Sequence, residues 1–155
     1  MIYVGFDPGL SGGIAFYSET GTLATHKMPV LKAGTKKVID LGRIKDLLNE
    51  YPADHLTGII ERVNAMPGQG VTSMFTFGEG FGMVKGLLTG MGIAYELVLP
   101  QRWQKQILNG IPADLKKQRG VLFCSQRFPR LKNLSDGEAD ALCMALYGAQ
   151  LTNSV

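Results

Sequence analysis

The stretch IYVGFDPG, residues 2–9, decides how the rest of the chain is interpreted. Residues 2–6 are short, β-branched and aromatic in character, and they predict a buried strand. Asp7-Pro8-Gly9 ends that strand, because Pro and Gly interrupt regular structure. Residues 13–18 and 22–28 predict two more strands joined by a tight turn. The chain should therefore begin as an antiparallel meander.

Outward from this meander, helix-like and strand-like segments alternate. We expect residues 29–38 to form a loop and the remaining elements to follow in the order helix, strand, helix, strand and three helices. The predicted helices span 40–50, 72–89, 100–108, 114–128 and 136–151, and the predicted strands span 56–63 and 93–99. This order indicates an α/β fold with a mixed five-stranded sheet flanked by helices.

Length and composition restrict the class of protein. With 155 residues and 45% hydrophobic residues, the chain should form one globular domain over 1–155, and disorder is excluded. No apolar run is long enough to cross a bilayer and no basic leader is visible, so we expect a cytoplasmic protein with no membrane partner. Cys124 and Cys143 fit neither a zinc motif nor a disulfide framework, and we expect reduced packing residues.

Charge is distributed unevenly along the chain. Between residues 100 and 132, eight basic residues face a single acid, Asp114, and the closing segment carries acids alone. The basic residues are Arg102, Lys105, Lys116, Lys117, Arg119, Arg127, Arg130 and Lys132. This pattern fits either a solvated helix face or a polyanion-binding surface beside a cation site.

Acidic residues stand where predicted strands end. Asp7 closes the first strand, and Glu61 lies near the end of the strand at 56–63. In α/β sheets these ends commonly line the ligand crevice. Structural explanations are also open, since Asp7 could cap the turn that follows it and Glu61 could pair with Arg62.

The last predicted helix adds more carboxylates. Asp136 and Asp140 are four residues apart, so they lie on one helix face, where like charges repel unless a cation is near. Ser135 and Glu138 have the spacing of a capping box, which gives Glu138 a structural role and ranks it below Asp136 as a ligand.

Carboxylates that converge in a crevice raise one another's pKa values, and hard divalent cations relieve this repulsion. We therefore expect Mg²⁺, for which Mn²⁺ could substitute, and two such ions close together could activate water and stabilise the leaving oxygen of a phosphodiester. His26 and His55 are isolated and expected at the surface, and the lack of soft ligands argues against zinc.

Three motifs together resemble the RuvC-type Holliday junction resolvases. They are Asp7-Pro8-Gly9 followed by SGGIA at 11–15, Glu61 after its strand, and EADAL at 138–142. The resemblance implies a ribonuclease H-like fold, a homodimer, two Mg²⁺ per active site and cutting of four-way DNA junctions.

The resemblance also assigns residues. It implies that Asp7, Glu61, Asp136 and Asp140 bind the metal, with Glu138 as the alternative fourth ligand, and that Lys105 and Lys116 lie near the scissile phosphate. The spacing of Asp136 and Asp140 matches phage-type relatives. The aromatic residue that cellular members carry after the strand-four glutamate is missing, and Met66 and Phe75 are the candidates for its role.

The helix at 72–89 corresponds in the family to the dimer helix. Gly78, Gly82 and Gly86 recur along it every four residues. Each costs a helix interior about 1 kcal/mol against Ala, which suggests a close neighbour on that face. That neighbour is either the protein's own sheet or a second subunit.

We therefore expect a Mg²⁺-dependent endonuclease in the cytoplasm of a bacterial cell or a phage-infected host. DNA phosphates should bind Arg102, Lys105, Lys116, Lys117 and Arg119, while Trp103 is expected in the core. The alternatives are a nuclease of the same fold acting on flaps, forks or RNA–DNA hybrids, and a catalytically silent junction-binding module. A small actin-like nucleotide-binding domain is disfavoured, because such ATPases need two lobes and a longer chain.

Overall fold

The sheet has the mixed architecture that the sequence predicts. The computed structural model describes residues 1–62, 64, 68 and 70–152. The strands are β1 (Ile2–Asp7), β2 (Gly13–Tyr17), β3 (Leu23–Lys27), β6 (Leu56–Glu61) and β7 (Ala94–Val98), in the order β3-β2-β1-β6-β7. β1 pairs antiparallel with β2 and parallel with β6, and β7 adds in parallel to β6. The strand at 56–63 is shorter than expected, since it ends at Glu61, and Val63 lies outside the described residues.

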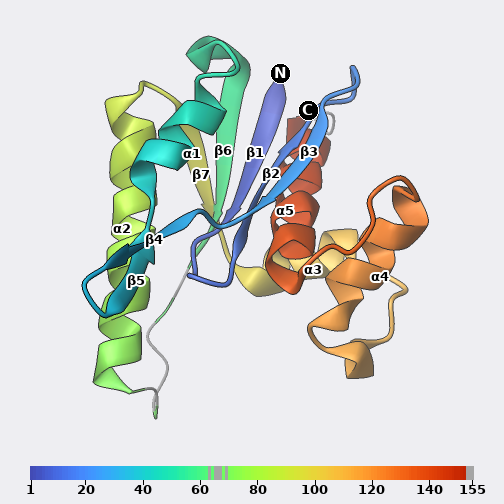
Figure 1. Cartoon of the computed structure of the whole chain (residues 1–155). Helices are drawn as coiled ribbons and strands as arrows, with labels where there is room; N and C mark the ends of the chain where they lie inside the picture. The colour runs from blue at the N-terminus through green and yellow to red at the C-terminus, as the bar shows by residue number, and fades with distance from the viewer. Residues whose placement is uncertain (63, 65–67, 69, 153–155) are drawn as a thin grey trace.

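Helices cover both faces of the sheet (Figure 1). α1 (Leu41–Leu48) and α2 (Val71–Gly90) lie on one face. α5 (Asp136–Thr152) lies on the other, with α3 (Pro100–Ile107) and α4 (Gln118–Arg127) packed beside it. No helix in the described part of the chain is long and apolar enough to cross a membrane.

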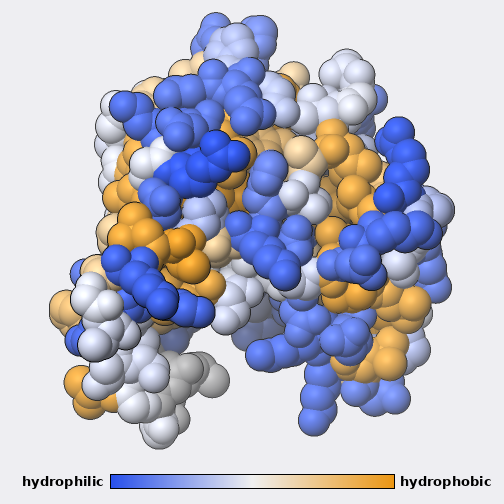
Figure 2. All heavy atoms as spheres, in the orientation of Figure 1, coloured by the Kyte–Doolittle hydropathy of each residue, from blue (hydrophilic) through white to orange (hydrophobic). Residues whose placement is uncertain are grey.

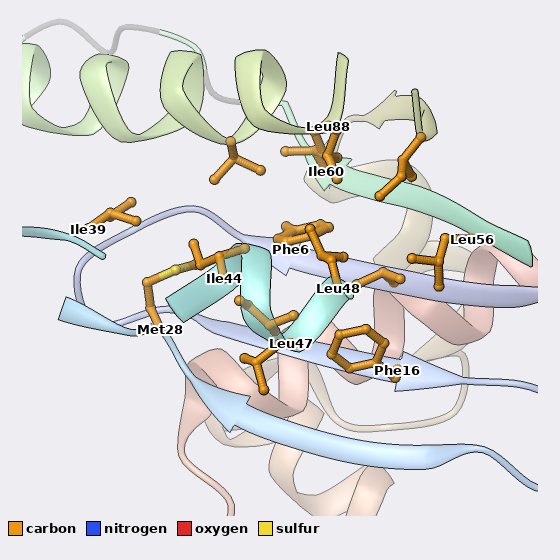
Figure 3. Packing of buried hydrophobic residues seen from close by; sticks show 14 residues of the cluster. Phe6, Phe16, Met28, Ile39, Ile44, Leu47, Leu48, Leu56, Ile60 and Leu88 are labelled. Carbon is orange, nitrogen blue, oxygen red and sulfur yellow. The ribbon is translucent and has the colours of Figure 1, made fainter. Parts of the chain in front are cut away.

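Two apolar clusters, one on each face, hold these layers together. Figure 3 shows the first, in which Phe6 and Ile60 of the sheet meet Ile44 and Leu48 of α1 and Leu88 of α2. The second cluster joins Ala15 and Ile59 of the sheet to side chains of α3, α4 and α5, and Cys124 and Cys143 are buried there as free thiols. Because the two central strands are buried on both faces, their ends are held rigidly.

α5 approaches the sheet closely because the sheet carries glycine where the two meet. A Cβ at Gly5 would overlap the carbonyl oxygen of Ala141 on α5. That atom belongs to helix backbone, so it cannot move aside as a flexible side chain could.

Gly5→Ala should therefore lower the free energy of unfolding by about 3 kcal/mol, at the upper end of the usual cost of overpacking. Gly90→Ala, at the end of α2 and outside the stripe of Gly78, Gly82 and Gly86, is the matched control, since nothing lies within 4 Å of the position its Cβ would take. That variant should gain up to about 1 kcal/mol from helix propensity. Chemical denaturation measures both, and equal effects of the two substitutions would contradict the close approach.

Gly86, Gly82 and Gly78 do not pack on the protein's own sheet. Each would have open space around an added Cβ, whereas α2 faces the sheet through Gly80, Val84 and Leu88. The interpretation of this stripe as a contact with the sheet is therefore wrong. The helix lies on the sheet through a different face.

The loop expected at 29–38 is instead a β-hairpin, formed by β4 (Val30–Ala33) and β5 (Lys36–Ile39). Gly34 at its tip has a φ of 64°, a left-handed backbone that favours glycine. The sequence prediction failed because the two strands are short and rich in lysine, so they lack the apolar alternation that marks a half-buried strand.

The helix expected at 114–128 is also interrupted. A 3₁₀ turn covers Ala113–Leu115, Lys116 has a φ of 48°, and α4 begins only at Gln118. A single residue in the left-handed region stops the helical ladder, so the first part of the expected helix becomes a bend.

Candidate active site

The four candidate carboxylates come from three elements, β1, β6 and α5, which meet at the end of the sheet where β1 and β6 terminate. Asp7 ends β1 and Glu61 ends β6, and these strands are parallel neighbours with Phe6 opposite Ile60. Asp136 begins α5 and Asp140 follows one turn later. A backbone bridge between Gly12 and Gly137 holds the start of α5 beside the loop that follows β1. We call Asp7, Glu61, Asp136 and Asp140 the acidic group.

The electrostatics show that the acidic group is close in space. Burial and the charges of Asp7, Glu61 and Asp136 together raise the pKa of Asp140 to about 7, and burial is the largest of these causes. Burial also raises the pKa of Glu61, and the charge of Asp7 adds to that rise. Residues 7, 61 and 140 thus repel one another, as convergent carboxylates should.

The pKa of Asp7 is also raised, but two neighbouring groups partly oppose the rise. Burial raises its pKa, while a hydrogen bond from the backbone of Gly9 and the positive charge of Lys117 lower it. Lys117 also lowers the pKa of Asp140. The sequence placed Lys117 only among the phosphate-binding residues, and no local pattern could have shown that its charge reaches the acidic group.

The donor chemistry of the acidic group suits hard divalent cations, because it consists of carboxylate oxygens. In the conformation that the structure describes, however, no group of three or more Asp, Glu, His or Cys side chains among the described residues is arranged so that it could hold a metal ion.

Trp103 fixes the orientation of Glu61. The indole is buried in the core, as expected, and its Nε1–H donates to Glu61 Oε1 at 3.0 Å. This bond favours the charged carboxylate and lowers the Glu61 pKa against the effect of burial. Sequence reasoning favoured a core position for Trp103 over a base-stacking one and missed this contact, which joins residues 42 positions apart.

On the expectation that Glu61 is a Mg²⁺ ligand, Trp103→Phe should weaken Mg²⁺ binding by about 10- to 100-fold, the usual loss when a partner that orients a metal ligand is removed. Ile107→Val is the matched control, because it trims the buried face of the same helix and leaves Glu61 hydrogen-bonded. The measurement is the Mg²⁺-dependent rise in melting temperature. If both variants kept the same Mg²⁺ dependence as the parent protein, the positioning role would be refuted.

Glu138 is occupied elsewhere. Its Oε2 accepts from the backbone N–H and the hydroxyl of Ser135 at 3.1 and 2.8 Å, and its Oε1 accepts from the Thr25 hydroxyl at 3.3 Å. This is the expected capping box, extended to β3. Asp136 accepts one bond, from Gln118 Nε2 at 3.1 Å, and contributes to the raised pKa of Asp140. Asp136 thus remains the better candidate for the fourth ligand.

A basic cleft opens beside Asp140. It has a volume of about 320 Å³, and Lys116, Lys117 and Arg119 line it together with Gln104, Leu108, Ala113 and Gly120. Arg102 and Lys105 occupy exposed positions on α3, next to this cleft in the chain but not part of its lining. Of the two lysines expected near the scissile phosphate, Lys116 is therefore the one placed beside the acidic group.

Arg119 differs from the other basic residues because its guanidinium is turned inward. Its Nη2 donates to the carbonyl oxygens of Leu108 and Ile111 at 3.1 and 3.2 Å, and its Nε is buried. These bonds hold the connection between α3 and α4, which carries Lys116 and Lys117. Arg119 is thus built as a positioning residue for the basic cleft.

Other residues singled out from the sequence are dispersed. Phe75 is 72% exposed on α2, and Met66 lies outside the described residues. His55 is exposed, as expected, whereas His26 is half-buried with its ring edge-on to Phe16. Neither histidine is near enough to the acidic group to shift its pKa values.

The strand order, the crossovers and the placement of the last helix define a ribonuclease H-like α/β fold. Solved structures of RuvC from Thermus thermophilus have this fold. The complex of T. thermophilus RuvC with a Holliday junction substrate matches with a TM-score of 0.68 and 15% identity, over 99% of this chain and 96% of that chain. A second T. thermophilus RuvC structure matches with a TM-score of 0.60 and 20% identity over the same shares. No protein-family model and no curated protein sequence matches the chain.

Proposed function

We propose that this protein is a Mg²⁺-dependent endonuclease that resolves four-way DNA junctions. The observation that carries the proposal is the placement of the acidic group at the ends of β1 and β6 and the start of α5, where Asp140 lines a cleft together with Lys116 and Lys117, and where burial and the neighbouring carboxylates raise the pKa of Asp140 to about 7. A site that gathers buried acids next to lysines is suited to a cation and a phosphate together. The likeness of the fold to RuvC bound to a Holliday junction agrees with this substrate.

In the proposed reaction, Asp7, Glu61, Asp136 and Asp140 hold two Mg²⁺, for which Mn²⁺ can substitute. The ions would supply positive charge that favours attack of water on the phosphodiester and departure of the 3′-oxygen. Trp103 keeps Glu61 charged and oriented. Lys116 and Lys117 bind the phosphate beside Asp140, while Arg102 and Lys105 bind phosphates further along the strand, and Arg119 braces the cleft.

The test is incubation of the purified protein with labelled four-way junction, flap, fork, RNA–DNA hybrid and linear duplex, with Mg²⁺ and with EDTA. Paired, Mg²⁺-dependent cuts in opposed strands of the junction are expected, with weak cutting of linear duplex. Preferential cutting of flaps, forks or hybrids would identify a different nuclease of this fold. Tight junction binding without any cutting would identify a binding module instead.

We also propose a homodimer that forms through α2. The stripe of Gly78, Gly82 and Gly86 is open to solvent in the single chain, and Phe75 and Val71 are exposed on the same helix. Glycines that contact nothing in their own subunit lower helix stability with no gain, unless a second helix packs against them. A two-fold dimer would present two active sites to a two-fold-symmetric junction.

Gly82→Leu should weaken self-association by at least about tenfold, because a large side chain would block close approach of a second helix. This loss corresponds to about 1.4 kcal/mol or more of association free energy. Sedimentation equilibrium measures the dissociation constant. Lys45→Leu places the same side chain on the exposed face of α1 and serves as the control. Unchanged association of the Gly82 variant would contradict the proposed interface.

A further inference from the structure

The β4–β5 hairpin starts at the same edge of the sheet as the acidic group. The N–H of Met28, just before β4, donates to the carbonyl of Gly12 at 3.0 Å, and Gly12 is bridged to Gly137 at the start of α5. Asp40 closes the base of the hairpin with a bond to Pro29 at 2.9 Å. The hairpin base is therefore tied to the loop that follows Asp7.

One residue anchors the hairpin to the core. Ile39 is 5% exposed and packs against Gly80 of α2, so closely that a Cβ added at Gly80 would lie 2.8 Å from Ile39 Cδ1. All four residues of β4 are exposed, and β4 pairs only with β5, in a sheet of two strands. Two-stranded ribbons are marginal in water. Burial therefore explains the base of the hairpin but not the outer part.

The outer part is a concentration of positive charge. Lys32, Lys36 and Lys37 are all exposed there, and Lys32 lies directly opposite Lys37 across the ribbon. Like charges in this arrangement destabilise a strand pair. None of the three has a carboxylate partner within the described part of the chain. A bound polyanion would remove the repulsion.

A second cleft lies beside the hairpin base, and the loop that follows Asp7 forms part of its lining. It has a volume of about 400 Å³ and lies between the loop after β1, the end of β5 and the first turns of α2. Ser11, Thr72, Ser73 and Thr76 contribute hydroxyls to its lining. Hydroxyls of this kind commonly donate to DNA phosphates.

The hairpin and the basic cleft lie on opposite sides of the acidic group. In Figure 1 the hairpin stands beside α2, while α3 and α4 occupy the other side of the sheet end. Figure 2 shows an indentation between these two halves of the molecule; hydrophilic surface dominates on the side of α3 and α4, and strongly hydrophilic patches stand among apolar ones on the hairpin side. Basic residues on two sides suit DNA whose duplex arms diverge at the site of cutting.

We propose that the hairpin is a second DNA-binding element, which holds the phosphate backbone of a duplex arm on the side of the acidic group away from α3 and α4. The inference rests on the proposed function, because it assigns the hairpin to the same branched DNA substrate. Its binding is electrostatic and independent of base sequence, since phosphates carry no sequence information.

The double variant Lys32→Ala/Lys37→Ala tests the proposal. Arg43→Ala/Lys45→Ala is the matched control, because it removes the same charge from exposed positions on α1. The affinity of each protein for labelled four-way junction is measured in EDTA at several salt concentrations from about 50 to 200 mM, the range over which phosphate contacts dominate the salt dependence.

The hairpin variant should bind the junction on the order of tenfold more weakly, with a log–log salt slope shallower by about 2, and the control should bind as the parent does. At saturating protein the hairpin variant should still cut with Mg²⁺ at the parental rate, because the acidic group is intact. Equal affinity and salt slope for the hairpin and control variants would overturn the inference. The proposed function would still stand in that case, provided that the parent protein binds and cuts the junction. Failure of the parent to bind branched DNA would overturn both.

Discussion

Asp7→Asn should reduce Mg²⁺-dependent cutting of a four-way junction by at least about 10³-fold, a loss of about 4 kcal/mol of transition-state stabilisation. Asp7 ends the central strand and repels Glu61 and Asp140, so it lies at the middle of the acidic group. Asparagine has the same shape and can still accept the bond from Gly9, but it lacks the negative charge that an ion requires.

The fold of the Asp7 variant should be intact, and its unfolding free energy should be equal to or higher than the parent's, because one of several repelling buried charges is gone. Junction binding in EDTA should also persist. Asp46→Asn, on the exposed face of α1, removes one charge away from the site and should cut normally. Parental cutting rates in the Asp7 variant would refute its assignment as a metal ligand.

Asp140→Asn should have two opposite effects: it should abolish cutting to a similar extent and stabilise the metal-free protein. Burial and three neighbouring carboxylates raise the Asp140 pKa to about 7. The folded state therefore binds a proton more tightly than the unfolded chain, whose Asp pKa is about 3.9. Between about pH 4 and pH 7 the folded state holds more protons, so stability falls as pH rises through this window.

At about pH 7.5 the parent carries the full cost of a charged Asp140, and the variant should be more stable by up to roughly 4 kcal/mol, the equivalent of about three pKa units. Below about pH 4 the difference should vanish. Chemical denaturation at both pH values, in EDTA, gives the measurement. Mg²⁺ should then stabilise the parent more than the variant, since binding to the folded state alone raises its stability. A difference independent of pH would contradict the raised Asp140 pKa.

Much of the fold could be predicted from local pattern. The apolar run that ends in Asp7, the turn that follows it and the helical spacing over 72–89 and 136–151 each specify an element within a few residues, and the order of elements implies the mixed sheet. The hairpin at 30–39 could not be found this way. Its lysines do not produce the alternation of apolar and polar residues that marks a strand. The hairpin is held in place because Ile39 packs on α2 and the N–H of Met28 donates to the carbonyl of Gly12.

The candidate site divides in the same manner. Asp7, Glu61 and the closing pair could be chosen from the sequence because acids at strand ends and at one helix face are unusual in apolar surroundings. The roles of Trp103 and Arg119 could not be chosen in this way. Trp103 acts through a hydrogen bond to Glu61, which is far away in the chain, and Arg119 acts through bonds that depend on the bend between α3 and α4.

The amino-acid sequence by itself therefore determined the five strands of the main sheet, most of the helices and the set of acids to examine, because periodicity and turn chemistry act over a few residues. Only the tertiary structure decided how strongly those acids repel, which face of α2 stays open and where the hairpin lysines stand. These properties depend on burial and on distances between residues remote in the chain, and both arise only when the two apolar clusters close around the sheet.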